Sequence, residues 1–408
     1  MMTQKQKIVI AGGGFGGVRA ALKLARSGAF DITLISDHTT FRYYPALYAT
    51  ATGHAYDESI IPIDDMIGRY PVIQFVHDSV TTLNAKKKQI STASGQVHQY
   101  DFLIIAVGMV TNYFGIPGLQ ESSFGIKSQE EIKAFRAHIH TEIEAGKVDA
   151  NYVVVGGGPT GIELGASLRA HIEHIAKNHD IETSKTSFIL VEAMERLLPK
   201  MPARAGRLIQ RRLAKLGIEV RTNAKVEAAT SENVTINGEV VESKTVIWTS
   251  GVANNPFFET NRTQFKLSPN KKVAVDEFLQ GAPSVYVIGD NANTPYSGLA
   301  QTALYDADFV AKNLIRQARH AKPKTYKPYN PPVVIPVGKR WALVKFWGLM
   351  FAGWPGALLR RVADLIGYAD VLPLSKALSL SLRSGKQQAD CEICETATTT
   401  KSDATHEN

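Results

Sequence analysis

The sequence is poor in cysteine, and its two cysteines lie near the end of the chain. Cys391 and Cys394 fall in a polar segment, and none occurs between Met1 and Asp390. A disulfide framework is therefore excluded for the body of the protein, as is typical of a reducing compartment. Two sulfur ligands do not complete a zinc site, so we predict no metal centre. We interpret this C-x-x-C as an incidental pair, with a redox role as the alternative.

Acidic residues are absent from one long segment. Residues 309–363 include eleven Lys and Arg residues and no Asp or Glu. That local excess is larger than the net charge of +8 of the whole chain, which has 46 basic and 38 acidic residues. The positive charge is therefore concentrated and predicts one anionic partner, such as an anionic membrane surface. We predict no nucleic-acid partner.

Long uninterrupted apolar runs are also absent. No apolar segment precedes the first expected strand at Ile8, so we expect no secretory signal and a cytoplasmic protein. The apolar stretch 341–359 is interrupted by Lys345 and Pro355 and falls short of a membrane-spanning helix. With 44% hydrophobic and 21% charged residues, the 408-residue chain is typical of a globular protein of about two or three domains.

Two glycine clusters with the spacing G-x-G-x-x-G are the strongest motifs present. In each, a β-branched run ends at a glycine, and apolar residues at helical spacing follow. The first glycine makes a tight turn, the second lets a pyrophosphate approach the backbone, and the third lets the helix pack on the strand. The two clusters therefore predict two dinucleotide sites, those of a flavoprotein. The residues are Gly12, Gly14, Phe15, Gly16 and Gly17 in the first cluster, and Gly156, Gly158, Pro159, Thr160 and Gly161 in the second.

An acidic residue about 20 positions after each cluster is expected to accept hydrogen bonds from a ribose. After the first cluster the sequence has Ser36 and then Asp37, and alternation of strand side chains leaves open which one faces the ribose. After the second it has Glu192, whose carboxylate would repel a 2′-phosphate and favours NADH over NADPH. Arg196 is close by and could accommodate that phosphate, so NADPH stays the alternative.

Further candidate site residues follow buried strands. Gly108 ends one such strand, and Gly251 ends its counterpart in the second domain. The strand 285–288 delivers Asp290, whose carboxylate could accept hydrogen bonds from a ribityl chain or cap a helix. Because this strand comes long after the second cluster, we expect the chain to have returned there to the first domain.

Other segments have weaker signals. The aromatic stretch 41–52 has no clear period, and we interpret it either as core packing beneath a loop or as a wall beside the flavin ring. Residues 72–83 are expected to begin a meander of short strands. Residues 204–216 are expected to form a helix with a basic face.

The C-terminal region predicts a surface helix. Apolar residues recur there at helical spacing, with basic residues on the other side. Such a helix, with nearby aromatic residues, is typical of attachment to anionic lipid. The alternatives are a helical pair that closes the core and a homodimer interface. The apolar residues are Leu358, Leu359, Val362, Leu365 and Ile366, with Arg360, Arg361 and Asp364 opposite.

Taken together, the motifs resemble those of the type II NADH:quinone oxidoreductases over residues 8–382. The resemblance is carried by GGGFGG at 12–17, AVGMVTNYFGIPG at 106–118, VVGGGPTGIELG at 154–165, LVEAMERLLP at 190–199, WTSGV at 248–252, VIGDNA at 287–292 and LAQTA at 299–303. It implies an α/β fold of two Rossmann-like domains that bind FAD and NADH, plus a C-terminal amphipathic helical membrane-anchor region. It also implies hydride transfer from NADH to FAD and electron delivery to a membrane quinone, without proton pumping, at the cytoplasmic side of the cell membrane.

The resemblance also implies a domain division and two further site residues. Residues 1–112 and 256–328 would form the FAD-binding domain, 113–255 the NADH-binding domain, 329–382 the membrane-association region and 383–408 a disordered tail. Glu163 would lie near the flavin ring, although a carboxylate capping the first turn of its helix is the alternative. Ala300 and Gln301 would begin a helix, expected from Ala303 onward by its apolar spacing, that points at the flavin, with Gln301 donating to a quinone carbonyl.

Some residues depart from the family pattern. Ser36 stands where most members have an acid, and Tyr305 and Asp306 replace two glutamines. The lack of cysteine in the body argues against the related disulfide reductases and sulfide oxidoreductases, which need reactive thiols. A soluble NAD(P)H-dependent flavoprotein reductase with another acceptor is the alternative enzyme. An NADH-sensing flavoprotein is the alternative without turnover.

Overall fold

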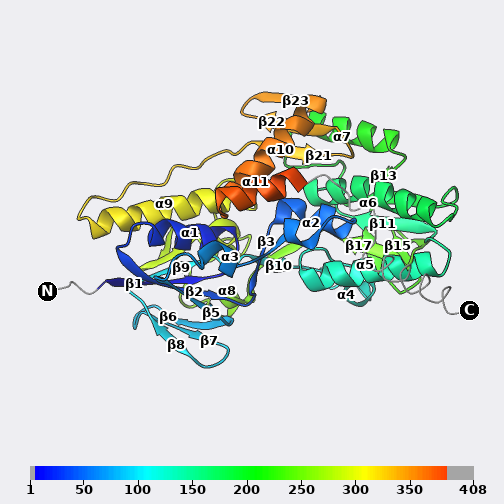
Figure 1. The fold of residues 1–408 in the computed structure, drawn as a ribbon. Coiled ribbons are helices and arrows are strands. Elements are labelled where there is room, and N and C mark those ends of the chain that lie inside the picture. The colour runs from blue at the N-terminus through cyan, green and yellow to red at the C-terminus, as the bar shows by residue number, and fades with distance from the viewer. Residues whose placement is uncertain (1–4, 384–408) are drawn as a thin grey trace, which may run out of the picture.

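Two parallel β-sheets carry the two glycine clusters in the computed structural model, which describes residues 5–383 (Figure 1). The first sheet has the strand order β19-β20-β9-β1-β2-β5. All its neighbours run parallel except β19, which is antiparallel to β20. The predicted Rossmann-like α/β architecture is confirmed. The strands are β19 (Gln280–Ala282), β20 (Val285–Val287), β9 (Phe102–Ile105), β1 (Gln6–Ala11), β2 (Phe30–Ser36) and β5 (Ile73–His77).

Both faces of the first sheet are covered, which explains why its strands read as continuous apolar runs. Ile8 and Ile10 on β1 face one core, and Val9 faces the other, because side chains alternate along a strand. The first core contains the helices α1 (Phe15–Ala25) and α9 (Ala300–Ala318). The second contains α8 (Pro256–Thr260) and residues of the meander β6 (Val80–Asn84), β7 (Gln89–Thr92) and β8 (Val97–Gln99).

The second sheet repeats this arrangement with the strand order β13-β12-β11-β17, all parallel. Its strands are Glu219–Arg221, Ser187–Val191, Asn151–Val155 and Thr245–Trp248. Tyr152 and Val154 face the helices, and Val153 faces the opposite core. The helices are α5 (Gln129–Glu144), α6 (Pro159–Asn178) and α7 (Ala203–Lys215), and the opposite layer is β14 (Val226–Ala229), β15 (Asn233–Ile236) and β16 (Glu239–Glu242).

An antiparallel ribbon marks the passage between the two sheets. It pairs β10 (Met109–Thr111) with β18 (Val252–Asn254), and the short helix α4 (Leu119–Ser122) follows β10. Downstream, β20 pairs with β9 of the first sheet. The prediction that the chain returns at residues 285–288 is therefore confirmed.

Several expected element boundaries were wrong. α1 begins at Phe15, although its apolar spacing predicts a start at Val18, and α9 begins at Ala300 and not at Ala303. α6 continues to Asn178, past the end that its spacing predicts near His174. Residues 72–83 do not all belong to a meander, since β5 joins the main sheet. Within the aromatic stretch, the strand β3 (Thr40–Arg42) pairs with β4 (Ile60–Pro62). A helix, α2 (Tyr44–Ala51), then follows, and α3 (Asp64–Ile67) comes after β4.

The C-terminal region is not purely helical, which corrects the predicted helical anchor. It starts with an antiparallel sheet of β21 (Val333–Pro336), β22 (Ala342–Phe346) and β23 (Leu349–Gly353), followed by α10 (Trp354–Ala369) and α11 (Leu374–Arg383). β-branched residues in β21 and β22 favour strands, and two short connections that contain Gly338 and Gly348 separate the three strands. Over the described residues, 5–383, no helix has the length and apolar character needed to span a bilayer. Cys391, Cys394 and the rest of 384–408 lie outside that range.

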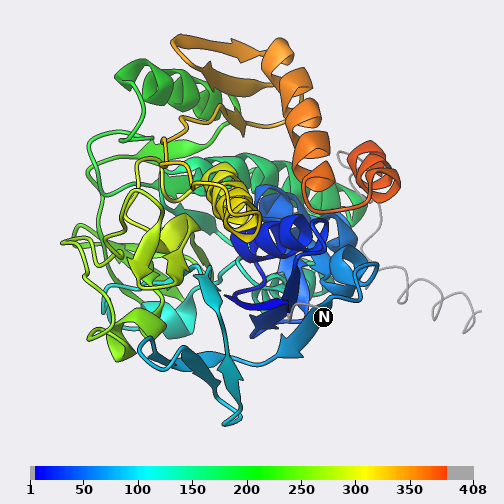
Figure 2. The same cartoon turned by 90° about the vertical axis from the view of Figure 1, so that its left-hand side faces the viewer.

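The helix α10 is bound firmly to the first domain. The Tyr368 ring stacks on Tyr43 with ring centroids 4.2 Å apart, and its hydroxyl donates to the Glu58 carbonyl at 2.6 Å. Arg19 on α1 lies 3.2 Å from the Asp370 carboxylate. Figure 2 shows α10 and α11 against the same side of the molecule as α1 and α9. The C-terminal region is therefore part of the folded body.

A buried carboxylate lies at the far end of α5. The Tyr152 hydroxyl donates to Glu142 at 2.9 Å, and burial raises the pKa of Glu142 to about 7. His138, Lys147, Asp149 and Lys244 are the other charged or titratable groups that act on this site. Because the pKa is raised above that of an unfolded chain, the folded state is favoured while Glu142 is protonated and loses that stabilisation as pH rises towards 7.

We expect Glu142→Gln to stabilise the protein at pH 8 and to change little at pH 5. Glutamine keeps the acceptor for Tyr152 and removes the cost of a buried charge, which is at most about 3 kcal/mol for a pKa raised from 4.5 to about 7. Melting temperatures of both proteins at the two pH values measure the effect. An equal difference in melting temperature between the two proteins at pH 5 and pH 8 would contradict the raised pKa of Glu142.

Candidate active site

The first glycine turn has the backbone geometry that a dinucleotide site requires. Gly12 has φ +111°, and a Cβ there would lie 2.3 Å from the Ala106 carbonyl oxygen. A Cβ at Gly17 would lie 1.8 Å from the Gly12 oxygen, so only glycine lets α1 approach β1 this closely. A Cβ at Gly14 would meet nothing within 4 Å. The turn is thus closed on the protein side and open where a pyrophosphate would approach.

The second turn repeats the first position by position. Gly156 has φ +127°, a Cβ at Gly161 would lie 1.9 Å from the Gly156 oxygen, and Gly158 faces open space. No side chain caps the first turn of either following helix, which starts at Phe15 in α1 and at Pro159 in α6. Unpaired N–H groups and the positive end of the helix dipole favour phosphate at both turns.

The structure identifies which residues occupy the two ribose-acceptor positions. Glu192 accepts a hydrogen bond from the Gly157 N–H at 2.7 Å, and from Met194 N–H at 2.8 Å through its other oxygen. Ser36 is in the equivalent place, since its Oγ lies 2.6 Å from the position of a Cβ on Gly13. Asp37 is exposed and lies 3.5 Å from the His38 ring. The side chain at the first turn is therefore Ser36, and Asp37 is exposed beside His38.

Arg196 is engaged by the protein itself. Its guanidinium donates to three backbone carbonyls, with Nη1 2.9 Å from the Met201 oxygen and Nη2 2.7 Å from the Pro199 oxygen. The third is the Leu198 oxygen at 3.1 Å. These bonds bind the arginine to its own loop, so it is poorly disposed to receive a 2′-phosphate.

Asp290 lies on a short 3-10 turn, η2 (Gly289–Asn291), that follows β20. Burial raises the pKa of Asp290, and the nearby charge of Lys272 opposes that shift. Asn291 bonds both sides of Gly108, accepting from its N–H at 2.8 Å and donating to its carbonyl at 2.7 Å. The turn therefore joins the ends of β9 and β20 and brings Gly108 and Asp290 together.

Asp306, on α9, forms a hydrogen bond with the η2 turn. It is fully buried, accepts from the Gly289 N–H at 3.0 Å and from the Tyr326 hydroxyl at 2.6 Å, and burial raises its pKa to about 6. The Tyr305 hydroxyl donates to the Lys327 carbonyl at 2.9 Å. Asp306 and Tyr305, which replace the two family glutamines, are therefore both engaged in hydrogen bonds within the protein. Gln301 is exposed in the first turn of α9, one residue after Ala300.

Two basic residues at the first site carry no sequence signal that identifies them. Arg42 contacts the His38 ring. Burial of the hydroxyl raises the pKa of Tyr44, the charge of Arg42 lowers it and the charge of Asp290 raises it. Lys272 is half-buried and donates to Ser297 at 2.7 Å. Both are cations in the surroundings of Asp290, since the charge of Lys272 acts on Asp290 and that of Arg42 acts on Tyr44, on which Asp290 also acts. Neither belongs to a periodic pattern, so only their spatial position identifies them.

Glu163 forms a buried ion cluster with two residues of α10. Its carboxylate lies 3.5 Å from Arg360, and Arg360 in turn bonds Asp364 at 2.9 Å and donates to the Pro45 carbonyl. Burial raises the pKa of Glu163 to about 8, Arg360 lowers it and Asp364 raises it. The helix-cap interpretation is wrong, because α6 begins at Pro159 and Glu163 lies beyond its first turn.

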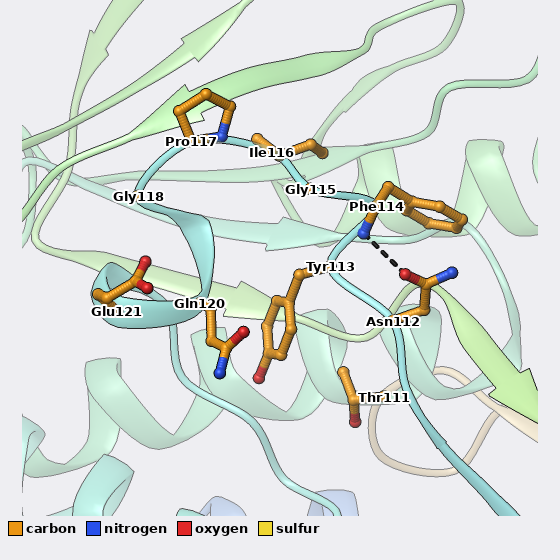
Figure 3. A pocket seen from close by; sticks show the side chains of 10 residues that line it. All are labelled: Thr111, Asn112, Tyr113, Phe114, Gly115, Ile116, Pro117, Gly118, Gln120 and Glu121. Atoms are coloured by element: carbon orange, nitrogen blue, oxygen red, sulfur yellow. Dashed lines mark hydrogen bonds between the residues drawn. The ribbon is translucent and has the colours of Figure 1, made fainter. Parts of the chain in front are cut away.

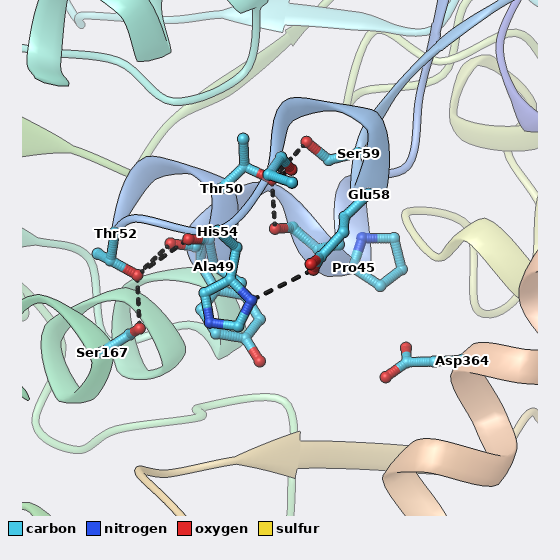
Figure 4. Close-up of polar contacts among 12 residues, drawn as sticks. Pro45, Ala49, Thr50, Thr52, His54, Glu58, Ser59, Ser167 and Asp364 are labelled. Carbon is cyan, nitrogen blue, oxygen red and sulfur yellow. Dashed lines mark hydrogen bonds and ion pairs between the residues drawn. The ribbon is translucent and has the colours of Figure 1, made fainter. Parts of the chain in front are cut away.

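Polar contacts hold α2 between α6 and the loop that precedes β4 (Figure 4). Thr52 shares a hydrogen bond of 2.6 Å with Ser167 on α6, and Thr50 shares one of 2.7 Å with Ser59. Because Pro45 on α2 also bonds Arg360, the three helices α2, α6 and α10 meet around Glu163. The aromatic stretch therefore borders the Glu163 cluster and contributes to the core, while its place beside the flavin ring stays a prediction.

The crossover after β10 contains an open pocket of about 460 Å³. Trp248 Nε1 donates to the Asn112 carbonyl at 3.0 Å, and a Cβ on Gly251 would lie 2.2 Å from that same oxygen. Gly251 therefore permits the close passage of the two connecting strands. Figure 3 shows the lining residues, which are Thr111, Asn112, Tyr113, Phe114, Gly115, Ile116, Pro117, Gly118, Gln120 and Glu121.

Comparisons with known proteins agree with this geometry. The family model of pyridine nucleotide-disulphide oxidoreductases matches residues 6–321. The type II NADH:quinone oxidoreductase Ndh of Mycobacterium tuberculosis is 30% identical over 396 residues, covering 90% of this chain and 85% of that protein. The Staphylococcus epidermidis protein described as a type II NADH:quinone oxidoreductase is 25% identical, covering 89% and 95%.

Solved structures have the same fold. NDH2 from Plasmodium falciparum, in complex with NADH, has a TM-score of 0.84 at 18% identity and covers 95% of this chain and 100% of its own. The sulfide:quinone oxidoreductase from Aquifex aeolicus has a TM-score of 0.76 at 19% identity, covering 95% and 98%. By its family match and its relatives, this chain belongs to the pyridine nucleotide-disulphide oxidoreductase family and, within it, to the type II NADH:quinone oxidoreductases.

Proposed function

We propose that this protein is an FAD-dependent NADH:quinone oxidoreductase that does not pump protons. The observation that carries the proposal is the pair of equivalent glycine turns, each open at its second glycine and followed by an uncapped helix. When bound, FAD would accept a hydride from NADH and pass electrons to a quinone. The chain supplies binding, orientation and electrostatics.

The first turn is the proposed FAD site and the second the proposed NADH site. FAD would be held by Gly12, Gly14, Phe15, Gly16, Gly17, Ser36, Gly108, Asp290, Ala300 and Gln301, and NADH by Gly156, Gly158, Pro159, Thr160, Gly161, Glu192 and Gly251. Arg42 and Lys272 join the first set because their charges suit a pyrophosphate. The corresponding domains are 1–112 with 256–328 for FAD, 113–255 for NADH and 329–382 for membrane association.

NADH is the proposed electron donor in preference to NADPH. The Glu192 carboxylate faces the second turn, where it would repel a 2′-phosphate, and Arg196 is occupied by backbone carbonyls. Gln301 is the proposed quinone contact because it is exposed at the start of α9 and can donate a hydrogen bond. A soluble reductase with another acceptor is the alternative.

We expect the purified protein to oxidise NADH at enzymatic rates with ubiquinone or menaquinone analogues and to use NADPH far less well. Loss of reduced nucleotide absorbance measures both rates. Turnover confined to dyes or to ferredoxin-like acceptors would favour the soluble reductase. Stoichiometric flavin reduction without turnover would favour an NADH sensor, and a colourless protein that takes up no FAD would overturn the proposal.

Glu163 is the proposed catalytic carboxylate because its charge changes near neutral pH where α2, α6 and α10 meet. With a pKa of about 8, it becomes ionised as pH rises through that value. A carboxylate stabilises positive charge nearby, and the nicotinamide of NADH becomes positively charged when it loses a hydride. The charge of Glu163 therefore favours the oxidation of NADH.

We expect the rate of flavin reduction to rise with pH around 8 in the wild type and to be independent of pH there in Glu163→Gln. The substitution removes the titrating group and should slow reduction at pH 9 by roughly tenfold or more. Stopped-flow absorbance of the flavin measures the rate. An unchanged rate and pH profile would remove Glu163 from the catalytic residues.

A continuous apolar surface on the C-terminal region is the proposed membrane contact. Large apolar side chains are exposed on the hairpin β22–β23, along α10 and on α11. Exposed aromatic and aliphatic groups of this kind favour burial in the lipid interface, here at the cytoplasmic side of the membrane. A second copy of the chain is the alternative partner. The residues are Phe346, Trp347, Leu349, Phe351, Trp354, Leu358, Leu359, Val362, Ile366, Leu374, Leu378 and Leu382.

We expect Leu358→Ser with Ile366→Ser to weaken binding to phospholipid vesicles by roughly tenfold or more, because two apolar side chains are lost from the contact. Val97→Ser with Val240→Ser is the matched control, since these side chains have similar exposure and lie on β8 and β16, outside the C-terminal region. Vesicle sedimentation measures binding. Equal partitioning of both variants would contradict the membrane contact, and a vesicle-independent dimer weakened by the first variant would favour the second copy.

A further inference from the structure

The helix α7 has a strongly basic outer face that the proposed reaction does not use. Its sequence has five basic residues and no acidic one. Ala205, Gly206, Ile209 and Leu213 are buried against the second sheet. Four of the basic residues, Arg204, Arg207, Arg211 and Lys215, are exposed. The predicted basic-faced helix is therefore present, with its charge directed outward.

These four cations serve no evident local purpose. Within residues 5–383, no carboxylate lies within 4 Å of their charged groups. Their spacing of three and four places them along one ridge, where like charges repel each other. Arg204 also lies in the first turn of the helix, where the dipole disfavours positive charge. Such an arrangement lowers the stability of the helix unless an anionic partner covers it.

The ridge lies beside the proposed membrane contact. Arg212, the fifth basic residue of α7, donates to the Val337 carbonyl at 3.2 Å and lies over the Trp341 ring at 5.8 Å. These bonds attach α7 to the sheet that carries the apolar hairpin, and both views show the helix next to β22 and β23 (Figures 1 and 2). Lys339 and Arg340, in the turn between β21 and β22, are exposed at the same junction.

We infer that the outer face of α7 binds the phosphate groups of anionic phospholipids and forms a second membrane contact, on the proposed NADH-binding domain. Guanidinium groups bind phosphate through paired hydrogen bonds, and basic residues near an anionic leaflet add to membrane affinity. Continuity with the apolar surface favours lipid over an acidic protein or a nucleic acid as the partner. This inference rests on the proposed membrane contact of the C-terminal region.

The test compares Arg207→Gln with Arg211→Gln against the matched control Lys86→Gln with Lys87→Gln. The control removes two exposed lysines from the turn between β6 and β7, at the opposite end of the molecule in Figure 1. Binding of each FAD-loaded protein is measured by sedimentation with vesicles of phosphatidylcholine alone or mixed with phosphatidylglycerol. FAD content, melting temperature and NADH oxidation with a water-soluble quinone analogue confirm that both variants are folded and active.

We expect the α7 variant to bind the mixed vesicles about tenfold more weakly than the wild type and to bind phosphatidylcholine equally well. High salt should abolish the difference, because it screens exposed charges. Arg207→Lys with Arg211→Lys should retain most of the binding, and the lysine control should match the wild type.

Three results would overturn the inference. If the wild type binds the mixed vesicles and the α7 variant binds them equally well, α7 makes no lipid contact, while the C-terminal contact stands. A loss shared by both kinds of vesicle would mean that charge is not the cause. A wild type that binds neither kind of vesicle would overturn the C-terminal contact as well.

Discussion

The close approach of a helix to the strand before it is the constraint on which both nucleotide-binding units depend. At Gly17 and at Gly161 a single methyl group would fall within 2 Å of a carbonyl oxygen of the preceding turn, at 1.8 and 1.9 Å. Without that contact the helix would start farther from the sheet, and its first N–H groups would no longer face the open side of the turn. The positions of Ser36 and Glu192 follow from it, because each lies against the middle of its turn.

The two units share this backbone but differ in charge. The second has a carboxylate at the turn, while the first has the uncharged Ser36 and gains two cations, Arg42 and Lys272, from other segments. A carboxylate selects a ribose with free hydroxyl groups, whereas cations suit a phosphate-rich ligand. The same fold can therefore present one unit suited to exchange a nicotinamide nucleotide and another suited to retain its cofactor.

Arg360 gives the C-terminal region a direct part in the interior of the protein. It lies on α10, whose outer face carries exposed Leu358 and Ile366, yet its guanidinium reaches Glu163 on α6 and the Pro45 carbonyl on α2. Removing one partner from such a buried cluster is costly, since it leaves a charge uncompensated. The helix that offers an apolar face to the surroundings is therefore also a structural element of the candidate active site.

What the sequence by itself determined was the fold class, the two glycine turns and the family, because turn geometry depends on a few glycines at a fixed spacing. It also indicated the basic face of α7, since helical spacing alone defines a helix face.

The sequence did not fix where helices start, because α1, α6 and α9 begin without side-chain caps that a pattern could detect. The strands of the C-terminal region were missed for a related reason, as short aromatic runs fit a helix and a hairpin equally well. Only the tertiary structure decided that Ser36 lies against the first turn while Asp37 is exposed, and that Arg196 is bound to its own loop. It also decided that Arg360 is largely buried while Arg361 is exposed. The physical reason is that these outcomes depend on contacts between segments far apart in the chain, whose packing sets the burial and the charge partners of each side chain.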